Sequence, residues 1–273
     1  MYLPRKLVVT LAAVLSIGAV LWLVDSVVAT RVEHRISQTV AEHSRLETNP
    51  GIYVAGFPYL QALLTNELPM VSADALDVDV PGIGTVNARS EITELVVEPN
   101  QVLSGDIIGA PAELITRTIS LDGVALGNLL GMTDLDIANP YDMSPSGGGV
   151  TEAQFTGTPE AFDEPVTVVV TLRLDGPIFR MTPRELVDVP DGREQEVAAA
   201  FTWELDTRQL PLAGQAQAVY AQGGSIYFRA QKRNVPLKME DLSPIEASPE
   251  DSPEAAGGDG AEDPVDAAVD LLR

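Results

Sequence analysis

The sequence predicts an α+β protein in which an apolar N-terminal segment leads into an amphipathic helix and then a succession of antiparallel strands. Three observations predict it. A run of apolar residues without any charge extends from Leu7 to Val24. Apolar residues at helical spacing follow it. Beyond residue 50, short stretches of alternating apolar and polar residues are separated by Gly-, Pro- and Asn-containing turns, which is typical of antiparallel strands.

The first apolar run predicts one transmembrane helix. Eighteen residues in helical geometry are about 27 Å long, close to the thickness of the bilayer hydrocarbon core. Arg5 and Lys6 precede the run and Asp25 ends it, so we expect a cytoplasmic N-terminus and an extracytoplasmic main domain. We assign residues 1–25 to a signal anchor in the cell membrane. The small residues of Val27-Val28-Ala29 leave a cleaved signal peptide as the alternative.

The second helix is expected to continue from the first and to pack one stripe on a sheet. Val28, Val32, Ile36 and Val40 recur at helical spacing, and Asn49-Pro50-Gly51 ends the pattern. The only two histidines, His34 and His43, are nine residues apart and therefore lie on different faces of this helix. We expect them to be solvated rather than catalytic.

A sharp corner follows the helix. The strand-like run Ile52-Tyr53-Val54 reaches Gly56 and Pro58, after which Leu60, Leu63, Leu64 and Leu68 fall at helical spacing. From the residues alone, this is either a corner buried in an ordinary core or part of an apolar binding groove.

The segment Gly56-Phe57-Pro58-Tyr59-Leu60-Gln61 resembles the Gly-Phe-Pro-Phe-Leu signature of the LmeA-like phospholipid-binding family of actinobacterial envelope proteins. The resemblance extends from the N-terminal apolar segment to about Leu237 and includes a Leu-Pro step, Leu210-Pro211, before a final hairpin. Asn66 stands where the family has a glycine. Asparagine tolerates a left-handed backbone better than most residues, so we expect the turn there to be kept.

The resemblance implies a tubular lipid-binding fold. In such a fold a strongly curved antiparallel sheet wraps a long N-terminal helix and forms an elongated apolar groove. It also implies a phospholipid ligand and no cofactor. The residues that we expect to line the groove are those of the corner: Val54, Phe57, Tyr59, Leu60, Leu63 and Leu64.

The remaining elements are predicted from periodicity. Strands are expected at residues 71–80 (with a bulge near Ala75-Leu76), 86–97, 101–108, 115–121, 135–137, 150–156, 166–174, 178–181, 216–221 and 225–231, and helices at 124–130 and 194–205. Residues 144–149 are expected to form a flexible loop. The clearest strand is 166–174, in which Val166, Val168 and Val170 share one face. Gly223-Gly224 predicts a hairpin turn between the last two strands.

Composition excludes several classes of protein. The net charge of −23 argues against nucleic-acid binding, and the absence of cysteine excludes disulfides and thiol chemistry. Neither a Gly-x-Ser-x-Gly elbow nor a Walker glycine loop is present. The pairs Asp77/Asp79 and Asp134/Asp136 are expected by chance in so acidic a chain, and we interpret them as solvated carboxylates. We therefore expect no enzymatic activity and no metal site.

Charge is distributed unevenly near the C-terminus. The basic residues Arg229, Lys232, Arg233 and Lys238 are candidates for binding anionic lipid headgroups, although they could equally pair with the acidic residues downstream. Residues 240–273 contain 11 acids and one base, counted along the sequence. Low hydrophobicity predicts that this tail is disordered, with a short transient helix near its end. The folded domain is thus expected at 26–239.

These observations lead to two hypotheses on function. The first is a membrane-anchored, extracytoplasmic phospholipid-binding protein that carries lipid or, as the resemblance implies, assists the maturation of envelope lipoglycans. The alternative is a non-enzymatic envelope interaction module whose acidic tail recruits a basic protein partner. An enzyme acting on envelope lipids has the least support.

Overall fold

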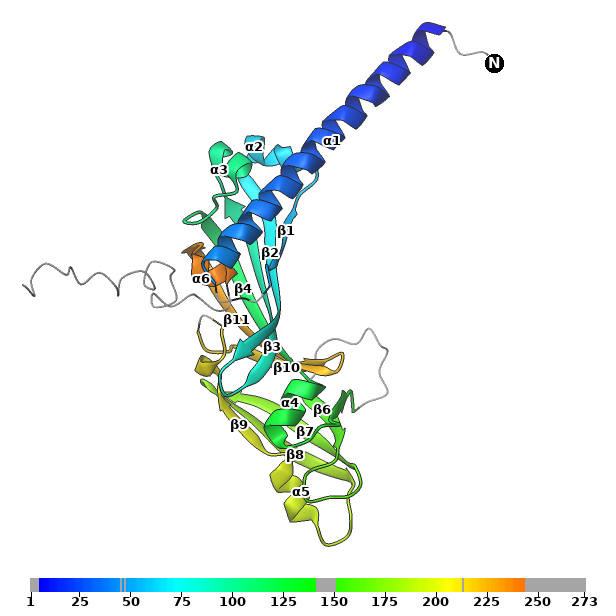
Figure 1. The fold of residues 1–273 in the computed structure, drawn as a ribbon, viewed down its shortest axis with the longest axis vertical. Coiled ribbons are helices and arrows are strands. Elements are labelled where there is room, and N and C mark those ends of the chain that lie inside the picture. Colours follow the sequence, from blue (N-terminus) through cyan, green and yellow to red (C-terminus); the bar gives the residue numbers. More distant parts are fainter. Residues whose placement is uncertain (1–4, 45, 47, 141–150, 213, 244–273) are drawn as a thin grey trace, which may run out of the picture.

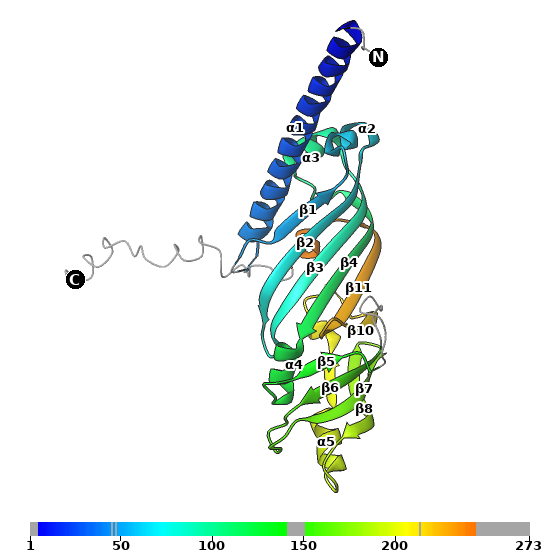
Figure 2. The ribbon, with the colours of Figure 1, turned by 90° about the vertical axis from the view of Figure 1, so that its right-hand side faces the viewer.

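The computed structural model describes residues 5–44, 46, 48–140, 151–212 and 214–243. The molecule is elongated: α1 projects from one end, a first sheet forms the middle and a second sheet forms the other end (Figures 1 and 2). The helices are α1 (Arg5–Glu42), α2 (Ala62–Thr65), α3 (Pro99–Ser104), α4 (Gly123–Leu130), α5 (Glu194–Ala200) and α6 (Met239–Leu242), with 3₁₀ turns η1 (Tyr59–Gln61) and η2 (Thr207–Gln209). The strands are β1 (Gly51–Ala55), β2 (Glu67–Val80), β3 (Gly84–Val96), β4 (Pro111–Asp122), β5 (Asp136–Ala138), β6 (Glu152–Gly157), β7 (Val166–Asp175), β8 (Ile178–Asp188), β9 (Trp203–Asp206), β10 (Ala218–Gln222) and β11 (Ser225–Pro236).

Helix α1 is continuous over 38 residues and has two different halves. Between Val9 and Val24 its apolar side chains are exposed, and by length and composition this part could cross a membrane. Beyond Asp25 the stripe of Val32, Ile36 and Val40 is buried. The predicted packing of this stripe on a sheet is confirmed.

The first sheet has the order β1-β2-β3-β4-β11-β10, and all its pairs are antiparallel. It curls strongly along its length (Figure 2). The register between β2 and β3 shifts between Ala75 and Val78, which confirms the predicted bulge and increases the local twist. The hairpin turn at Gly223-Gly224 is also confirmed, because Gln222 pairs with Ser225.

The second sheet is an antiparallel meander of β5-β6-β7-β8-β9, inserted between α4 and β10. Val166, Val168 and Val170 of β7 are buried as the alternation predicts. The family resemblance implied one curved sheet, whereas the structure has two. Strands β5–β9 have the same alternation as those of the first sheet, so periodicity alone does not show which strands pair.

Two clusters of buried apolar residues hold the molecule together. One lies between the second sheet and the adjoining part of the first sheet, and it includes Phe155, Phe179 and Phe228. The other lies between α1, β1–β4, α3 and α6, and it includes Ile36, Ile92 and Leu237. The expected α+β class and curled antiparallel sheet are therefore confirmed.

Three local predictions were wrong. Residues 101–108, predicted as a strand, belong to α3 and the loop after it. Pro99 opens the helix, and Gln101 Oε1 caps its start by accepting a hydrogen bond from the Glu98 N–H at 2.9 Å. Gly105 ends the helix with a left-handed φ of +77°.

The helix predicted for 194–205 ends at Ala200, since Trp203–Asp206 pair with β8 as β9. The helix predicted after Pro58 ends at Asn66, whose φ of 54° is the expected left-handed value, so Leu68 belongs to β2. The predicted loop at 144–149 and the tail beyond Ser243 lie outside the described residues.

Candidate functional site

The corner between β1 and α2 is fixed to α1 by a buried carboxylate. Asp25, 5% exposed, accepts hydrogen bonds from the backbone N–H groups of Tyr59 (3.0 Å) and Leu60 (2.7 Å). These donors begin the 3₁₀ turn η1 and would otherwise lack partners. Eight residues further along α1, Glu33 Oε1 accepts the N–H of Val54 at 3.0 Å. The corner therefore cannot move independently of the helix.

Tyr59 links the same corner to α3. Its ring is 2% exposed, and its hydroxyl donates a hydrogen bond to the carbonyl oxygen of Val102 at 2.6 Å. Burial, together with the nearby carboxylates of Glu33 and Asp25, raises the pKa of Tyr59 to about 12. The phenol is thus neutral at physiological pH and acts as a structural donor rather than a proton-transfer group.

The six residues predicted to line the groove have very different environments. Val54 and Tyr59 are buried in the core, and Leu60 and Leu63 are half-buried. Phe57 is 75% exposed and Leu64 is 86% exposed. Phe57, Leu60 and Leu64 border an open apolar groove of about 520 Å³, whose other wall is α1 at Gly18, Leu21, Trp22 and Asp25. We call this the corner groove.

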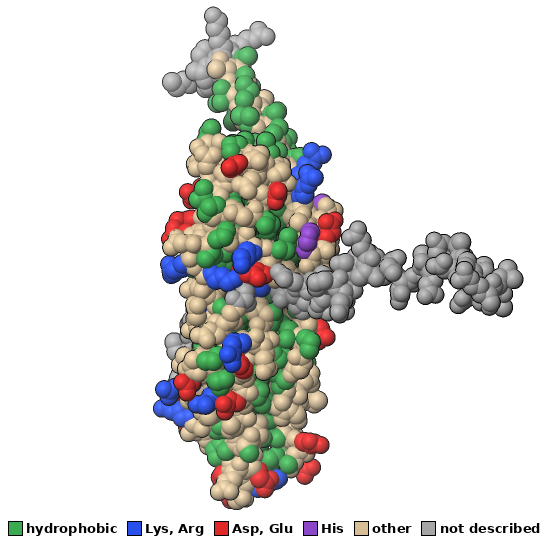
Figure 3. Space-filling model, turned by 90° about the vertical axis from the view of Figure 1, so that its left-hand side faces the viewer, with side chains coloured by type: hydrophobic (Ala, Val, Ile, Leu, Met, Phe, Trp, Pro, Cys, Tyr) green, Lys and Arg blue, Asp and Glu red, His purple; other side chains and the backbone are tan. Residues whose placement is uncertain are grey.

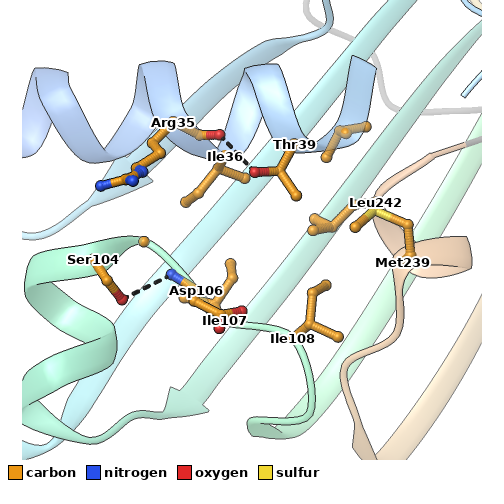
Figure 4. Close-up of a pocket in the computed structure, with 11 residues that line it drawn as sticks. Arg35, Ile36, Thr39, Ser104, Asp106, Ile107, Ile108, Met239 and Leu242 are labelled. Atoms are coloured by element: carbon orange, nitrogen blue, oxygen red, sulfur yellow. Dashed lines mark hydrogen bonds between the residues drawn. The ribbon is translucent and has the colours of Figure 1, made fainter. Parts of the chain in front are cut away.

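A second cavity lies beneath the buried half of α1. It has a volume of about 350 Å³ and lies between α1, the loop after α3, and α6 (Figure 4). We call it the helix pocket. Its apolar lining comes from Ile36, Val40, Ile107, Ile108, Met239 and Leu242, and its polar lining from Arg35, Thr39, Ser104 and Asp106.

Gly105 brings α3 close to α1 beside this pocket. A Cβ atom at this position would lie 3.3 Å from Val32 Cγ1 and 3.4 Å from the Val32 carbonyl oxygen, and the residue has φ +77°. Any side chain would therefore be strained by its backbone and crowded by α1. The glycine allows the loop that carries Ile107 and Ile108 to approach the helix and close one side of the pocket.

Helix α6 forms another wall of the pocket and is held by the buried side chain of Arg117. Arg117 is 4% exposed and projects from β4. Its guanidinium donates to Ser90 Oγ (2.9 Å) and to the carbonyl oxygens of Glu240 (2.7 Å), Ser243 (3.1 Å) and Pro211 (3.3 Å). A charged donor thus satisfies the carbonyls of Glu240 and Ser243, which would otherwise be buried without a hydrogen-bond partner.

The four predicted headgroup residues do not form one cluster, although Lys232 and Lys238 meet at Glu240. Arg229 donates from Nη2 to Tyr220 Oη at 2.8 Å, and its buried Nε has no hydrogen-bond partner. Lys232 lies three residues along β11 and so projects from the opposite face of the sheet. There it pairs with Asp241 at 2.8 Å and Glu240 at 3.4 Å. Lys238 pairs with Glu240 at 3.4 Å, and Arg233 is exposed.

The charge pairs on α6 shift the ionisation of both partners. Burial opposes the charge of Lys232, but its hydrogen bond and attraction to Asp241 raise its pKa above the usual lysine value. Burial likewise opposes ionisation of Glu240, yet Lys232 and Lys238 together lower its pKa. The pairing of basic residues with acidic residues downstream, one of the two alternatives from sequence, is present at α6.

One carboxylate of the Asp-x-Asp pairs, that of Asp134, is hydrogen-bonded within the fold. Asp134 accepts hydrogen bonds from the Thr158 N–H (2.8 Å) and hydroxyl (2.7 Å), which lower its pKa, and it secures the turn after β6. Among the residues that the structure describes, no group of three His, Asp or Glu side chains is arranged to hold a metal ion.

The fold and these cavities define a class of protein: an α+β protein whose N-terminal helix packs against a curled antiparallel sheet and borders an apolar pocket with a polar rim, as small-molecule sites commonly have. A family model described as LmeA-like phospholipid-binding matches residues 23–231, and the chain belongs to this family. No curated protein and no solved structure matches the chain. The match includes Asp25, the corner and Arg117, and it ends before Lys232 and α6.

Most of the helix pocket was not predicted from the sequence. Ile36 and Val40 were on the predicted buried stripe, but Ile107 and Ile108 were assigned to a strand and α6 was not predicted. Arg117 could have been identified from the sequence as a buried polar residue. It interrupts the apolar alternation of Ile115, Ile119 and Leu121 on one face of β4, and a charge at such a position indicates a buried polar contact.

Proposed function

We propose that the chain is a membrane-anchored, extracytoplasmic phospholipid-binding protein and that the helix pocket holds acyl-chain methylenes of the lipid. Membership of the LmeA-like family supports phospholipid as the ligand class. The single observation that carries the assignment to this pocket is its lining, in which the apolar side chains of Ile36, Val40, Ile107, Ile108, Met239 and Leu242 border a space of about 350 Å³.

The volume indicates how much lipid can be held in this conformation. About 350 Å³ lies at the lower end of the 300–1,000 Å³ range of ligand pockets, enough for part of one acyl chain and not for a whole phospholipid. The rest of the lipid would extend past the polar rim, to which Arg35 contributes a cation. An anionic headgroup is favoured there because a cation lowers the cost of holding a phosphate.

The biological role follows from anchoring and binding together. A tethered domain with an acyl-chain pocket is suited to hold phospholipid outside the cytoplasm, either as a carrier or as an accessory factor that presents lipid during lipoglycan maturation. The family resemblance supports this second role. We infer a non-enzymatic protein, since the family is described by binding.

The test is the amount of phospholipid that remains bound to the full chain. In Ile108→Glu, a carboxylate is placed in the lining at a residue 37% exposed, where the fold should tolerate it. Phospholipid retained after purification, measured by native mass spectrometry and lipid extraction, should fall about tenfold, since an acyl chain would have to desolvate the charge. Val124→Glu, at a 68% exposed position on α4, is the matched control and should retain lipid. Equal retention by both variants would exclude the helix pocket.

A further inference from the structure

We propose that the corner at residues 56–66 enters the outer leaflet of the membrane beside α1, so that Phe57 and Leu64 contact bilayer lipid rather than a bound cargo molecule. This inference rests on the membrane anchoring in the proposed function. It assigns a lipid-bilayer contact to two residues whose exposure, 75% and 86%, is the highest among the large apolar side chains that the structure describes.

The length of the apolar helix segment limits where its last turns can lie. The run from residue 7 to residue 24 is about 27 Å long, which is barely enough to cross a hydrocarbon core of about 30 Å. Its last turns, which include Leu21 and Trp22, must therefore lie within the bilayer or at its surface. Both side chains are more than half exposed in the structure, and neither is covered by the domain.

The corner lies beside those same turns. Gly18, Leu21, Trp22 and Asp25 form one wall of the corner groove, and residues of the corner form the other. Because Asp25 binds the N–H groups of Tyr59 and Leu60, the corner is held at this level of α1. Any position of α1 that places Leu21 and Trp22 in the membrane also places Phe57 and Leu64 at its surface or below it.

The chemistry of this end of the molecule suits a bilayer. Residues 56–66 and 99–105 contain no charged side chain, although the whole chain contains 40 Asp and Glu residues. The two segments form the corner and α3, which lie side by side at the end from which α1 projects (Figures 1 and 2). Leu103 on α3 is a further exposed apolar side chain.

Charged residues set a limit to the depth of insertion. Glu67 and Glu98 are exposed and directly follow or precede the uncharged segments, so they would remain in water or among headgroups. The contact should therefore be shallow, about 5–10 Å into the boundary between headgroups and acyl chains, as for interfacial amphipathic segments. Trp22 is at the level where tryptophan is enriched in membrane proteins.

The test uses tryptophan fluorescence of the full chain in vesicles of phosphatidylcholine with brominated acyl chains, which quench only at contact. Trp22→Phe and Trp203→Phe remove the two native tryptophans, and Phe57→Trp or Leu64→Trp then introduces one reporter. We expect at least about half of the emission of each reporter to be quenched, because the side chains would reach the acyl-chain boundary. Leu76→Trp, at a 64% exposed position on β2 nine residues beyond Glu67, is the matched control and should not be quenched.

A second experiment distinguishes quenching by bilayer lipid from quenching by a bound phospholipid molecule. The same Phe57→Trp protein is loaded with brominated phospholipid and placed in unlabelled vesicles, where quenching can come only from the bound molecule. If the reporter is quenched by brominated vesicles but not by the bound brominated phospholipid, the result supports docking of the corner into the bilayer. If the bound phospholipid quenches the reporter, or if brominated vesicles quench Phe57→Trp and Leu64→Trp no more than Leu76→Trp, the docking proposal is overturned. Thermal unfolding of each variant verifies its fold.

The outcomes also separate this inference from the proposed function. If the full chain retains no phospholipid and takes none up from vesicles, while Phe57→Trp is quenched by the bilayer, the corner docks and phospholipid carriage fails. If the chain carries lipid and the reporter is not quenched, the docking inference fails and the proposed binding activity stands.

Discussion

Arg117 is the residue whose role depends most on its surroundings. It lies on β4 between the two buried apolar clusters, and the groups that it binds belong to β3, to the Leu210-Pro211 segment and to residues 240–243. Its partners are separated from it by up to 126 residues in sequence. One side chain thus joins three parts of the chain that form the middle of the molecule (Figures 1 and 2).

We expect Arg117→Met to destabilise the protein by about 3 kcal/mol, because several buried carbonyl oxygens would lose a charged donor. The measurement is chemical denaturation of the full chain. Arg173→Met, an exposed arginine on β7, is the control and should change stability by less than about 0.5 kcal/mol.

The same variant tests the attachment of α6. Without Arg117, trypsin should cleave after Lys238 faster, since the carbonyl groups of Glu240 and Ser243 are no longer held. An unchanged cleavage rate together with unchanged stability would show that α6 does not depend on this arginine.

At the scale of helices and strands, the contact between α1 and the corner fixes the orientation of the domain relative to the projecting half of α1. The exposed half of α1 and the buried half are one helix, so the direction of the first fixes the direction of the second. Figure 3 shows apolar side chains around the projecting helix and basic and acidic side chains mixed over the rest of that face. Along α1 itself, residues 7–24 carry no charged side chain, and Asp25 is the first charged residue after them.

We expect Asp25→Ala to lower the free energy of unfolding by about 1–2 kcal/mol, the usual range for a lost helix cap. Two N–H groups, those of Tyr59 and Leu60, would lose their acceptor. Asp25→Asn, which keeps one carbonyl oxygen, should fall between the wild type and Asp25→Ala. Glu42→Ala at the exposed end of α1 is the control. If all three variants unfold at the same denaturant concentration, Asp25 does not hold the corner.

At the scale of the whole molecule, the proposed topology places both sheets outside the cytoplasm. Arg5 and Lys6 precede the apolar run, and basic residues are retained on the cytoplasmic side. The complete absence of cysteine makes this testable with single introduced thiols.

We expect Leu76→Cys, at an exposed position on β2, to react with a membrane-impermeant maleimide in intact spheroplasts that express the full chain. Tyr2→Cys, on the other side of the apolar run, should react only after lysis. Reaction of Tyr2→Cys in intact spheroplasts would reverse the topology. Loss of the N-terminal residues from the mature protein, seen by mass spectrometry, would instead indicate a cleaved signal peptide.

The sequence by itself determined much of this protein. Periodicity gave the apolar helix, the buried stripe of Val32, Ile36 and Val40, and most strands, because each of these depends on the spacing of residues within one segment. The corner motif at residues 56–61 indicated the family that the match at residues 23–231 then established.

The tertiary structure decided what depends on contacts between distant segments. It divided the strands into two sheets, separated Arg229 from Lys232 across one sheet, left Phe57 and Leu64 exposed while burying Tyr59, and closed the helix pocket with α6. The physical reason is the same in each case. Local periodicity shows that one face of an element is apolar, but whether protein, lipid or water covers that face depends on which elements pack against it.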